Sequence, residues 1–319
     1  MGDMAHVVVC VDDTDDLTKK TSTGAIAEAL AEGAREMGGA VDAGVTRHQL
    51  LLDPRVPYTS HNSAMAFTAT LPEDAVEAFE EDAAWVVRSM MAPTANPGMA
   101  LGVVPDEADG ALGELVGFGL KAQKEYLEPR DAFSLAERIP WLRLRALGGT
   151  GWGVIGALAG AGLRLYGNDG RFRGSWDLSC GFREDEGRLP TLARVRAELE
   201  GELSCPVAFA EASGKPLDDG ERVAIVRDVK ALMRAGAFVV VVAEEDGVLR
   251  PFSKRDFDER GEASGGAFAC EAFSTDNDRE EFLGASSAPS CLNCLYRRLT
   301  PSGYACVGGK LSEREGAAA

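Results

Sequence analysis

Four carboxylates stand within five residues near the start of the chain, in the segment DDTDD at residues 12–16. Like charges at this density repel one another unless a cation lies among them. Mg²⁺ takes oxygen ligands and commonly links one or two carboxylates to the phosphates of a substrate. The segment is therefore a candidate magnesium loop. A solvated acidic turn is the alternative, and spacing alone does not decide between the two.

Two further segments have the composition of anion-binding turns. Thr21-Ser22-Thr23-Gly24 precedes an expected helix, where Ser and Thr serve as N-caps and free N–H groups can hold a phosphate. The run Gly148–Gly153 precedes a second expected helix, and its glycines let the backbone approach an anion closely. It lacks the Gly-Lys-Ser/Thr of a Walker loop.

The cysteines near the C-terminus suggest a second metal site. Cys291 and Cys294 have the CxxC spacing with which two thiolates reach one tetrahedral Zn²⁺, and Cys306 and Cys270 complete a set of four. An iron–sulfur cluster and buried, metal-free thiols are the alternatives. We expect the other three cysteines to be packing residues: Cys10, Cys180 and Cys205.

The hydrophobic pattern predicts the elements that position the acidic segment. The β-branched run His6–Val11 indicates a buried strand, and a helix begins at Gly24 and ends at the glycine pair 38–39. A strand, strand, helix, strand pattern over residues 41–105 indicates a ferredoxin-like insert. The acidic segment should therefore lie between a buried strand and a helix N-terminus.

The second half of the chain has a different pattern. The glycine turn opens onto a small-residue helix at Val154–Gly162. Farther on, a strand at Pro206–Glu211, a helix across Glu221–Arg234 and a strand at Ala237–Val242 predict a βαβ-like unit. We expect an α/β (α+β) fold class, with a first domain over residues 1–185, a small α/β domain over 186–258, and a Cys-rich module and tail over 259–319.

The length, net charge and hydropathy of the chain limit the classes of partner that we expect. A length of 319 residues suits about two domains, and the net charge is −18, whereas nucleic-acid binders usually have a basic excess. No apolar run reaches the roughly 18 residues of a membrane span, and the N-terminus lacks the basic region of a signal peptide. We therefore expect a cytoplasmic protein with reduced thiols. The sequence does not indicate an oligomeric state.

Four segments together resemble the archaeal tRNA-Ile agmatinylcytidine synthetase (TiaS) family. The similarity covers roughly residues 6–180, in the family's order and spacing. The segments are CVDDTDDLTKKTSTG at 10–24, RHQLLLDPRVPYTSHNSA at 47–64, Asn96-Pro97-Gly98, and GTGWGVIGALAGAG at 149–162. The resemblance implies a kinase-like nucleotide domain with a ferredoxin-like insert, in which ATP and Mg²⁺ activate an acceptor.

The resemblance also assigns roles to individual residues. It implies that Asp12, Asp13 and Asp15 are the metal-binding and catalytic residues. It places the following residues at the nucleotide: Thr14, Ser22, Thr23, Gly24, Thr59, His61, Asn62, Asn96, Gly149, Gly151 and Gly153. Where the family has Lys, Arg and Gly in its P-x-K-T-R-G-N pattern, this chain keeps only the Thr and Asn, and Trp152 replaces an Arg.

The leading hypothesis is an ATP- and Mg²⁺-dependent ligase- or kinase-like enzyme acting on a small-molecule or nucleoside acceptor. The acidic net charge and the altered C-terminal region favour this acceptor over tRNA, and a tRNA-modifying homologue is the closest alternative. The missing cationic positions favour a third reading, a non-catalytic nucleotide sensor or metal-bound adaptor. A redox protein using the cysteine module is a fourth.

Overall fold

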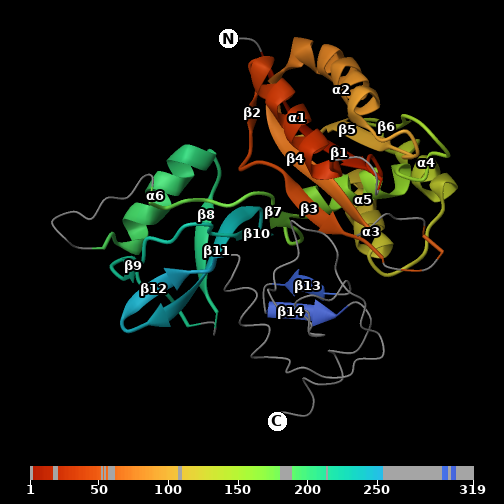
Figure 1. Ribbon diagram of the computed structural model, residues 1–319. Coiled ribbons are helices and arrows are strands. Elements are labelled where there is room, and N and C mark those ends of the chain that lie inside the picture. The colour runs from red at the N-terminus through yellow and green to blue at the C-terminus, as the bar shows by residue number, and fades with distance from the viewer. Residues whose placement is uncertain are drawn as a thin grey trace. The chain divides into compact units, whose positions relative to one another are not determined.

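The computed structural model divides the chain into two units, Met1–Arg173 and Gly174–Ala319 (Figure 1). No helix among the described residues is long and apolar enough to cross a bilayer. The structure describes residues 3–16, 21–51, 53, 55–56, 62–106, 110–179, 189–212, 215–253, 297–300 and 303–306.

The first unit is built on an antiparallel sheet whose central strand is β1 (Met4–Asp12). Its run of five residues from Val7 to Val11 is almost wholly buried, as the β-branched pattern predicts. β1 pairs with β4 (Ser63–Pro72) on one side and with β5 (Gly98–Val103) on the other. The remaining strands are β6 (Leu142–Ala146) beside β5, β3 (Thr46–Gln49) and β2 (Ala40–Val41) beside β4, and β7 (Arg171–Phe172) beside β3.

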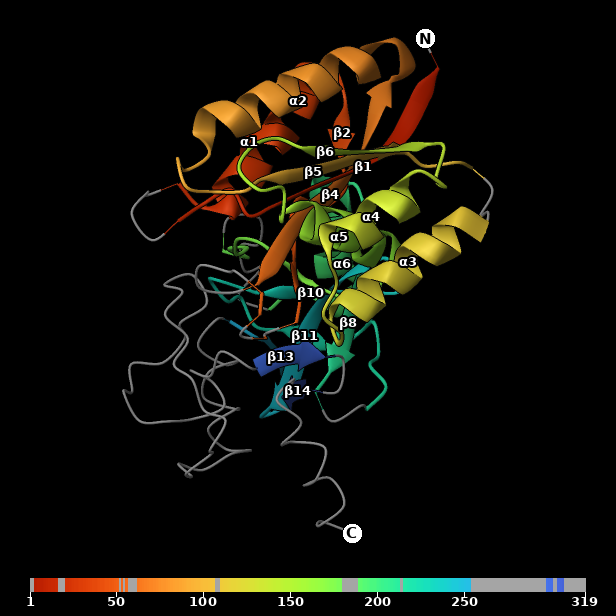
Figure 2. The same cartoon turned by 90° about the vertical axis from the view of Figure 1, so that its right-hand side faces the viewer.

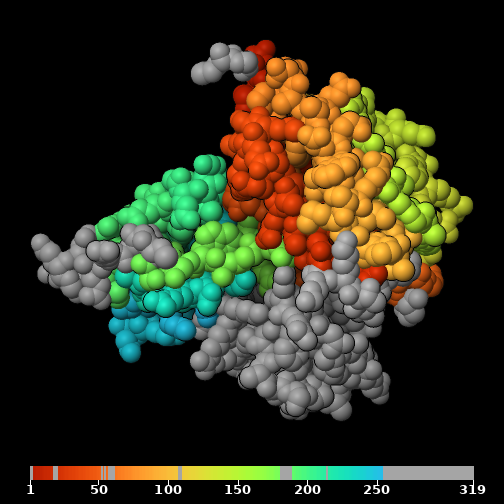
Figure 3. All heavy atoms as spheres, turned by 45° about the horizontal axis from the view of Figure 1, so that its top comes forward, coloured from red at the N-terminus to blue at the C-terminus, as the bar shows by residue number. Residues whose placement is uncertain are grey.

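Helices cover both faces of this sheet (Figure 2). Alternation along β1 sends Val7, Val9 and Val11 to one face and Val8 and Cys10 to the other. The first face is covered by α1 (Thr23–Glu36) and α2 (Val76–Met90), and the short η1 (Glu73–Ala75) precedes α2. In Figure 3 the atoms of the α1 part of the chain are red and those of the α2 part are orange. The second is covered by α3 (Gly110–Ala122), α4 (Pro129–Ala136) and α5 (Val154–Tyr166).

Helix α5 lies unusually close to the sheet because of its small residues. A Cβ on Gly160 would lie 2.5 Å from Cys10 Sγ and 2.8 Å from Ala64 Cβ. A Cβ on Gly162 would overlap the Leu115 carbonyl on α3. This close packing fixes the N-terminal turn of α5 against the end of β1, and it makes the buried Cys10 a packing residue, as the sequence indicates.

The second unit contains α6 (Leu192–Leu203) and a small sheet centred on β11 (Ala237–Glu245). Asp246 and Gly247, both at positive φ, form the turn that pairs β11 with the next strand. The other strands are β8 (Val207–Glu211), β9 (Arg222–Val223), β10 (Ala231–Arg234), β12 (Val248–Pro251), and the separate hairpin β13 (Arg297–Thr300) and β14 (Gly303–Cys306).

The predicted helix across Glu221–Arg234 is wrong. These residues contain β9 and β10, and β10 pairs antiparallel with β11 through a tight turn at Ala235 and Gly236. Strand pairing with β11 overrides the helical propensity of the segment. β8 and β11 are parallel, as in a βαβ unit, but the one helix described in this unit precedes β8.

The strands of the expected insert at 41–105 share one sheet with β1, which lies between β4 and β5. The structure is therefore a mixed α/β fold with a mainly antiparallel sheet in its first unit.

Candidate functional site

The acidic loop begins where β1 ends. Asp12 is the last residue of β1 and is only 9% exposed, and Asp13 turns the chain at a φ of 52°. The loop is held to the segment before β5, because Thr14 O accepts from Ala92 N at 2.9 Å and Asp16 accepts from Thr94 Oγ1 at 2.6 Å. The carboxylates are thus positioned by two segments that lie far apart in the sequence.

The environment disfavours the charged form of these carboxyl groups. Burial raises the pKa of Asp12 well above its ordinary value, and repulsion from Asp13 and Asp15 raises it further. Burial also raises the pKa of Asp13, although hydrogen bonds from the side chain and backbone of Asn96 partly oppose the shift. A cation beside Asp12 and Asp13 would relieve both effects.

Asn96 joins the acidic loop to the glycine turn. Its side chain hydrogen-bonds to Asp13, and its Oδ1 accepts from both the N–H and the hydroxyl of Thr150, each at 2.8 Å. Its carbonyl accepts from Gly153 N at 3.0 Å. The sequence motifs at residues 12–16, 96–98 and 149–153 therefore form one continuous hydrogen-bonded cluster at the end of β1.

Four glycines in or beside this cluster are required by their backbone conformation or their surroundings. Gly149 and Gly151 have φ values of 56° and 78°, which side-chain-bearing residues rarely adopt. A Cβ on Gly153 would lie 2.6 Å from both Asn96 O and Gly98 N. A Cβ on Gly156, in the first turn of α5, would overlap the Asp12 carboxylate, which therefore lies directly against the N-terminus of this helix.

Several N–H groups of the expected phosphate turns already have partners within the protein. Thr150 N and Gly153 N donate to Asn96. At the start of α1, Ser22 Oγ caps the helix by accepting from Ala25 N at 3.2 Å, and Asp15 accepts from Thr23 N at 3.0 Å. The N–H groups of Thr150 and Gly153 are therefore already used within the protein. A phosphate could bind the N–H group of Thr23 only if Asp15 gave up its hydrogen bond to that group.

A cation beside the α1 N-terminus was missed by sequence reasoning. A Cβ on Gly24 would overlap the guanidinium of Arg173, whose Nε also donates to Glu28 at 2.7 Å. Arg173 and Gly24 are 149 residues apart, so no local pattern links them. The guanidinium of Arg173 therefore lies at the start of α1, where it is paired with Glu28.

The residues of the acidic loop are compatible with a magnesium ion that takes some of its ligands from the protein and the others from water and a substrate. Thr14 is wholly buried, and its Oγ1 has no hydrogen-bond partner among the described residues. The described part of the chain contains no group of three or more His, Cys, Asp or Glu side chains gathered as a metal cage. Mg²⁺ commonly uses one or two carboxylates and takes its other ligands from water and phosphates, so Asp12 and Asp13 suffice.

Asn62 lies near the C-terminal end of the segment 47–64, which resembles the second TiaS motif. Its Nδ2 donates to Leu51 O at 2.7 Å, and its carbonyl accepts from Leu50 N at 2.6 Å. It therefore pins the segment that follows β3. Thr59 and His61, the other two candidates of this motif, lie outside the described residues.

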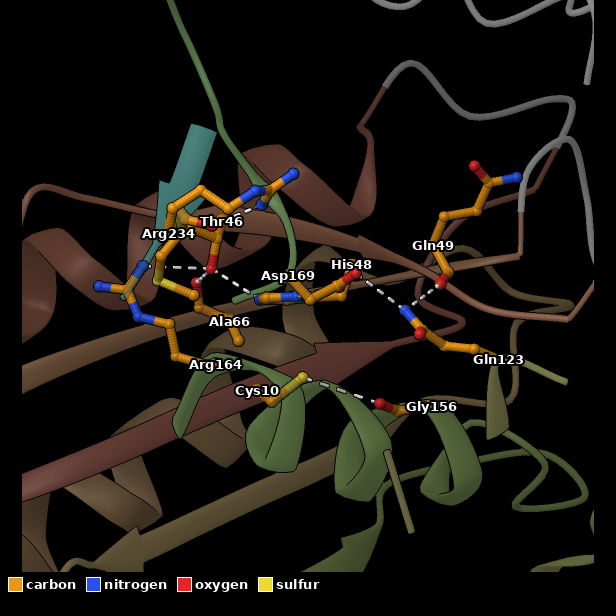
Figure 4. Close-up of polar contacts among 11 residues, drawn as sticks. Cys10, Thr46, His48, Gln49, Ala66, Gln123, Gly156, Arg164, Asp169 and Arg234 are labelled. Carbon is orange, nitrogen blue, oxygen red and sulfur yellow. Dashed lines mark hydrogen bonds and ion pairs between the residues drawn. The ribbon is translucent and has the colours of Figure 1, made fainter. Parts of the chain in front are cut away.

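A buried histidine network supports the same segment (Figure 4). His48 is fully buried, with Nδ1 2.9 Å from Asp169 Oδ2 and Nε2 2.8 Å from Thr46 Oγ1. Gln123 Nε2 donates to Asp169 Oδ1 at 3.0 Å and to Gln49 O at 3.3 Å. The network joins β3 to the segments after α3 and α5.

Replacing His48 with leucine should lower the free energy of unfolding by about 3 kcal/mol, because it removes both hydrogen bonds of a fully buried side chain and places an apolar group beside the Asp169 carboxylate. Urea unfolding followed by circular dichroism measures the change. His6→Leu is the matched control, because the His6 side chain is 43% exposed and its contact with Asp42 is 3.4 Å long. Equal effects of the two substitutions would contradict a supporting role for the network.

The cysteine candidates cannot be placed as a site. Cys270, Cys291 and Cys294 lie outside the described residues, as does Cys180. Cys306 ends β14, for which the structure describes only the backbone. The metal-module hypothesis stays a prediction.

Comparisons with known proteins give only partial likenesses. No family model and no curated protein matches the chain. Among solved structures, a complex of TiaS with an isoleucine tRNA and ATP is 24% identical with a TM-score of 0.40, over 50% of this chain and 36% of that one. Apo TiaS, a tRNA agmatidine synthetase, is 23% identical with a TM-score of 0.39, over 49% and 35%.

A tRNA fluorescent labeling enzyme is 21% identical with a TM-score of 0.40, over 62% of this chain and 44% of that chain. The chain thus matches about a third to less than half of the length of these proteins. At such scores the likeness by itself assigns neither a family nor an activity to this chain.

Proposed function

We propose that this chain is an ATP-using enzyme that binds Mg²⁺–ATP at the acidic loop and activates an acceptor by phosphoryl or nucleotidyl transfer. The observation that carries the proposal is the convergence of Asp12, Asp13 and the Asn96-linked glycine turn at the end of β1. The sequence resemblance to the TiaS family supports the same chemistry. Mg²⁺ would supply charge neutralisation at the phosphates.

The protein's own groups would orient the nucleotide. Asp12 and Asp13 would hold the metal, and Asn96 would fix the Asp13 carboxylate through its hydrogen bonds. Arg173 beside Gly24 is the group we propose to compensate for the cationic positions absent from residues 57–62. Positioning and charge neutralisation are the contributions that phosphoryl transfer requires of a protein.

We propose that the ferredoxin-like part of the fold covers residues 4–103 and therefore includes β1 and α1. It is then larger than the insert at 41–105 that the sequence pattern predicts. The sheet order β5-β1-β4-β3 and the position of α1 and α2 on one face support this arrangement. The acidic loop then belongs to the first β–α connection of that motif.

A nucleotide sensor is the second candidate function. The observation that favours it is the internal pairing of the Thr23, Thr150 and Gly153 N–H groups, which leaves fewer donors for a transferring phosphate. A sensor would bind ATP with no turnover in the presence of any acceptor.

The test is calorimetric titration with ATP in Mg²⁺ and in EDTA, followed by product analysis for ADP and AMP. The acceptor screen should include small amines, nucleosides and tRNA as separate arms. We expect Mg²⁺-dependent binding, and AMP formation would indicate nucleotidyl-type activation. An absence of Mg²⁺–ATP binding would overturn the proposal, and binding without turnover across all arms would favour the sensor.

Metal analysis tests the cysteine module separately. The CxxC spacing predicts about one Zn²⁺ per chain in purified protein, lost on Cys291→Ser substitution and kept in Cys205→Ser. Visible absorbance in anaerobically purified protein would instead favour an iron–sulfur cluster, and metal-free protein would favour simple thiols.

A further inference from the structure

Three planar side chains from separate segments of the first unit form a row beside the glycine turn. The Arg55 guanidinium lies over the Tyr126 ring, 4.5 Å from its centroid. The Tyr126 and Trp152 ring centroids are 6.2 Å apart, with an angle of 52° between the planes. Tyr126 comes from the connection between α3 and α4, and Trp152 from the turn before α5.

The row is not part of a hydrophobic core. None of the three side chains belongs to either core cluster of the first unit, and Arg55 is exposed while Tyr126 and Trp152 are half-buried. Leaving a tryptophan ring partly in water forgoes the stabilisation that its burial would give. The two hydrophobic cores of the first unit therefore do not include these rings.

Arg55 is held in its orientation by Asp53. Its Nε and Nη2 each donate to one oxygen of the Asp53 carboxylate, both at 2.8 Å. The pairing lowers the pKa of Asp53 to about 2, so the pair stays charged at neutral pH. A bidentate pair of this kind fixes the plane of the guanidinium against the tyrosine ring.

The row adjoins the acidic loop through Trp152 itself. On one side of Trp152, the backbone at Gly153 lies so close to Asp12 O that an added Cβ would be 2.8 Å from it. On the other side, Thr150 is bonded to Asn96, which also bonds Asp13. A ligand with phosphates at Asp12 and Asp13 would thus have its remaining part within reach of the rings.

We propose that Trp152, Tyr126 and Arg55 form a stacking platform for the nucleobase of a nucleotide or nucleoside bound at the acidic loop. The inference rests on the proposed function and names the ligand class of the same site. Aromatic rings and guanidinium planes both stack on bases. The base comes either from ATP or from an acceptor nucleoside.

The experiment measures binding of Mg²⁺–ATP, Mg²⁺–tripolyphosphate and cytidine to the wild type, Trp152→Leu and Trp152→Phe. Tripolyphosphate carries the phosphates without a base, and cytidine carries a base without phosphates. Because base–aromatic stacking contributes roughly 1–3 kcal/mol per base, we expect Trp152→Leu to lower the affinity for a base-bearing ligand about tenfold. Binding of tripolyphosphate should stay unchanged, and the Phe variant should bind nearly as wild type.

Trp85→Leu is the matched control. Trp85 is 68% exposed on α2, which covers the opposite face of the sheet from α5, so its loss should change none of the affinities. Tyr126→Leu is a second platform variant, in case Trp152→Leu fails to fold. Its effect should fall on the same ligand.

The outcomes separate the source of the base and the two proposals. If Trp152→Leu weakens the binding of ATP, the platform takes adenine. If it weakens the binding of cytidine and leaves that of ATP unchanged, the platform takes the base of an acceptor. Unchanged affinity for both, or an equal loss for tripolyphosphate, would overturn the platform. If the wild type binds neither ATP nor tripolyphosphate with Mg²⁺, the proposed function fails, while Trp152-dependent cytidine binding would still support the platform.

Discussion

The Asp12→Asn variant should lose Mg²⁺-dependent ATP turnover, with kcat/KM lowered at least about 100-fold. A metal ion contributes several kcal/mol to stabilising charge at a phosphoryl group, and an amide oxygen is a poor substitute for a carboxylate ligand. Steady-state assays at several Mg²⁺ concentrations measure the loss. Excess Mg²⁺ should restore little of the activity, because the missing charge lies in the protein.

The same substitution should raise the stability of the metal-free protein. Burial and the neighbouring carboxylates raise the pKa of Asp12, so its charged form is disfavoured in the folded state at neutral pH. Asparagine removes that cost with nearly the same shape. A higher unfolding midpoint in EDTA together with lost turnover is the signature of a residue kept for function.

Asp16→Asn is the matched control for this prediction. Asp16 belongs to the same loop and carries the same charge, but it is half-buried and accepts from Thr94 Oγ1. Its substitution should change turnover only a few-fold. If Asp12→Asn keeps full activity, or if both variants lose activity equally, Asp12 is not the metal-binding residue.

The second large effect is expected from Gly156→Ala. A Cβ at this position overlaps the Asp12 carboxylate, and the close packing of α5 on the sheet leaves the helix little room to move. We expect turnover to fall about 100-fold, since displacing a reacting group by about 1 Å has effects of that size. Overpacking should also lower the free energy of unfolding by about 2 kcal/mol.

A double-mutant cycle checks the physical cause. In the Asp12→Ala background the added methyl group no longer overlaps a carboxylate and meets only the Cβ of residue 12, 2.9 Å away, so Gly156→Ala should cost clearly less stability than in the wild type. Gly113→Ala on α3 is the control, because nothing lies within 4 Å of its added Cβ. It should stabilise the protein by about 0.5–1 kcal/mol through helix propensity. Additive effects of Asp12→Ala and Gly156→Ala would contradict direct contact between the two positions.

The sequence alone was sufficient for the elements whose patterns are local. The valine run of β1, the capped and glycine-terminated α1, and the small-residue α5 all form where the hydrophobic pattern places them. The hydrophobic periodicity of consecutive residues predicts these elements, so they can be identified without knowing which distant segments they pack against. The acidic loop follows β1 directly, and its place at a strand end was therefore predictable.

Pairing between distant segments was not predictable. The segment Glu221–Arg234 has helical periodicity but forms strands, because β11 offers it a pairing edge. β6 gives only a weak strand pattern before the glycine turn, because it is a strand of five residues at the edge of the sheet beside β5. Strand propensity depends on neighbours in the sheet, which a single sequence does not reveal.

By itself, the sequence determined which residue types gather near the site: the carboxylates of 12–16, Asn96 and the glycines of 149–153. Only the tertiary structure decided how they meet, because Asn96 bonds both Asp13 and Thr150, and Thr150 lies 54 residues farther along the chain than Asn96. It also showed that Gly156 touches Asp12, that Arg173 lies over Gly24, and that Trp152 and Tyr126 meet. These contacts depend on how closely α5 packs against the sheet, a property of the assembled core that no local pattern encodes.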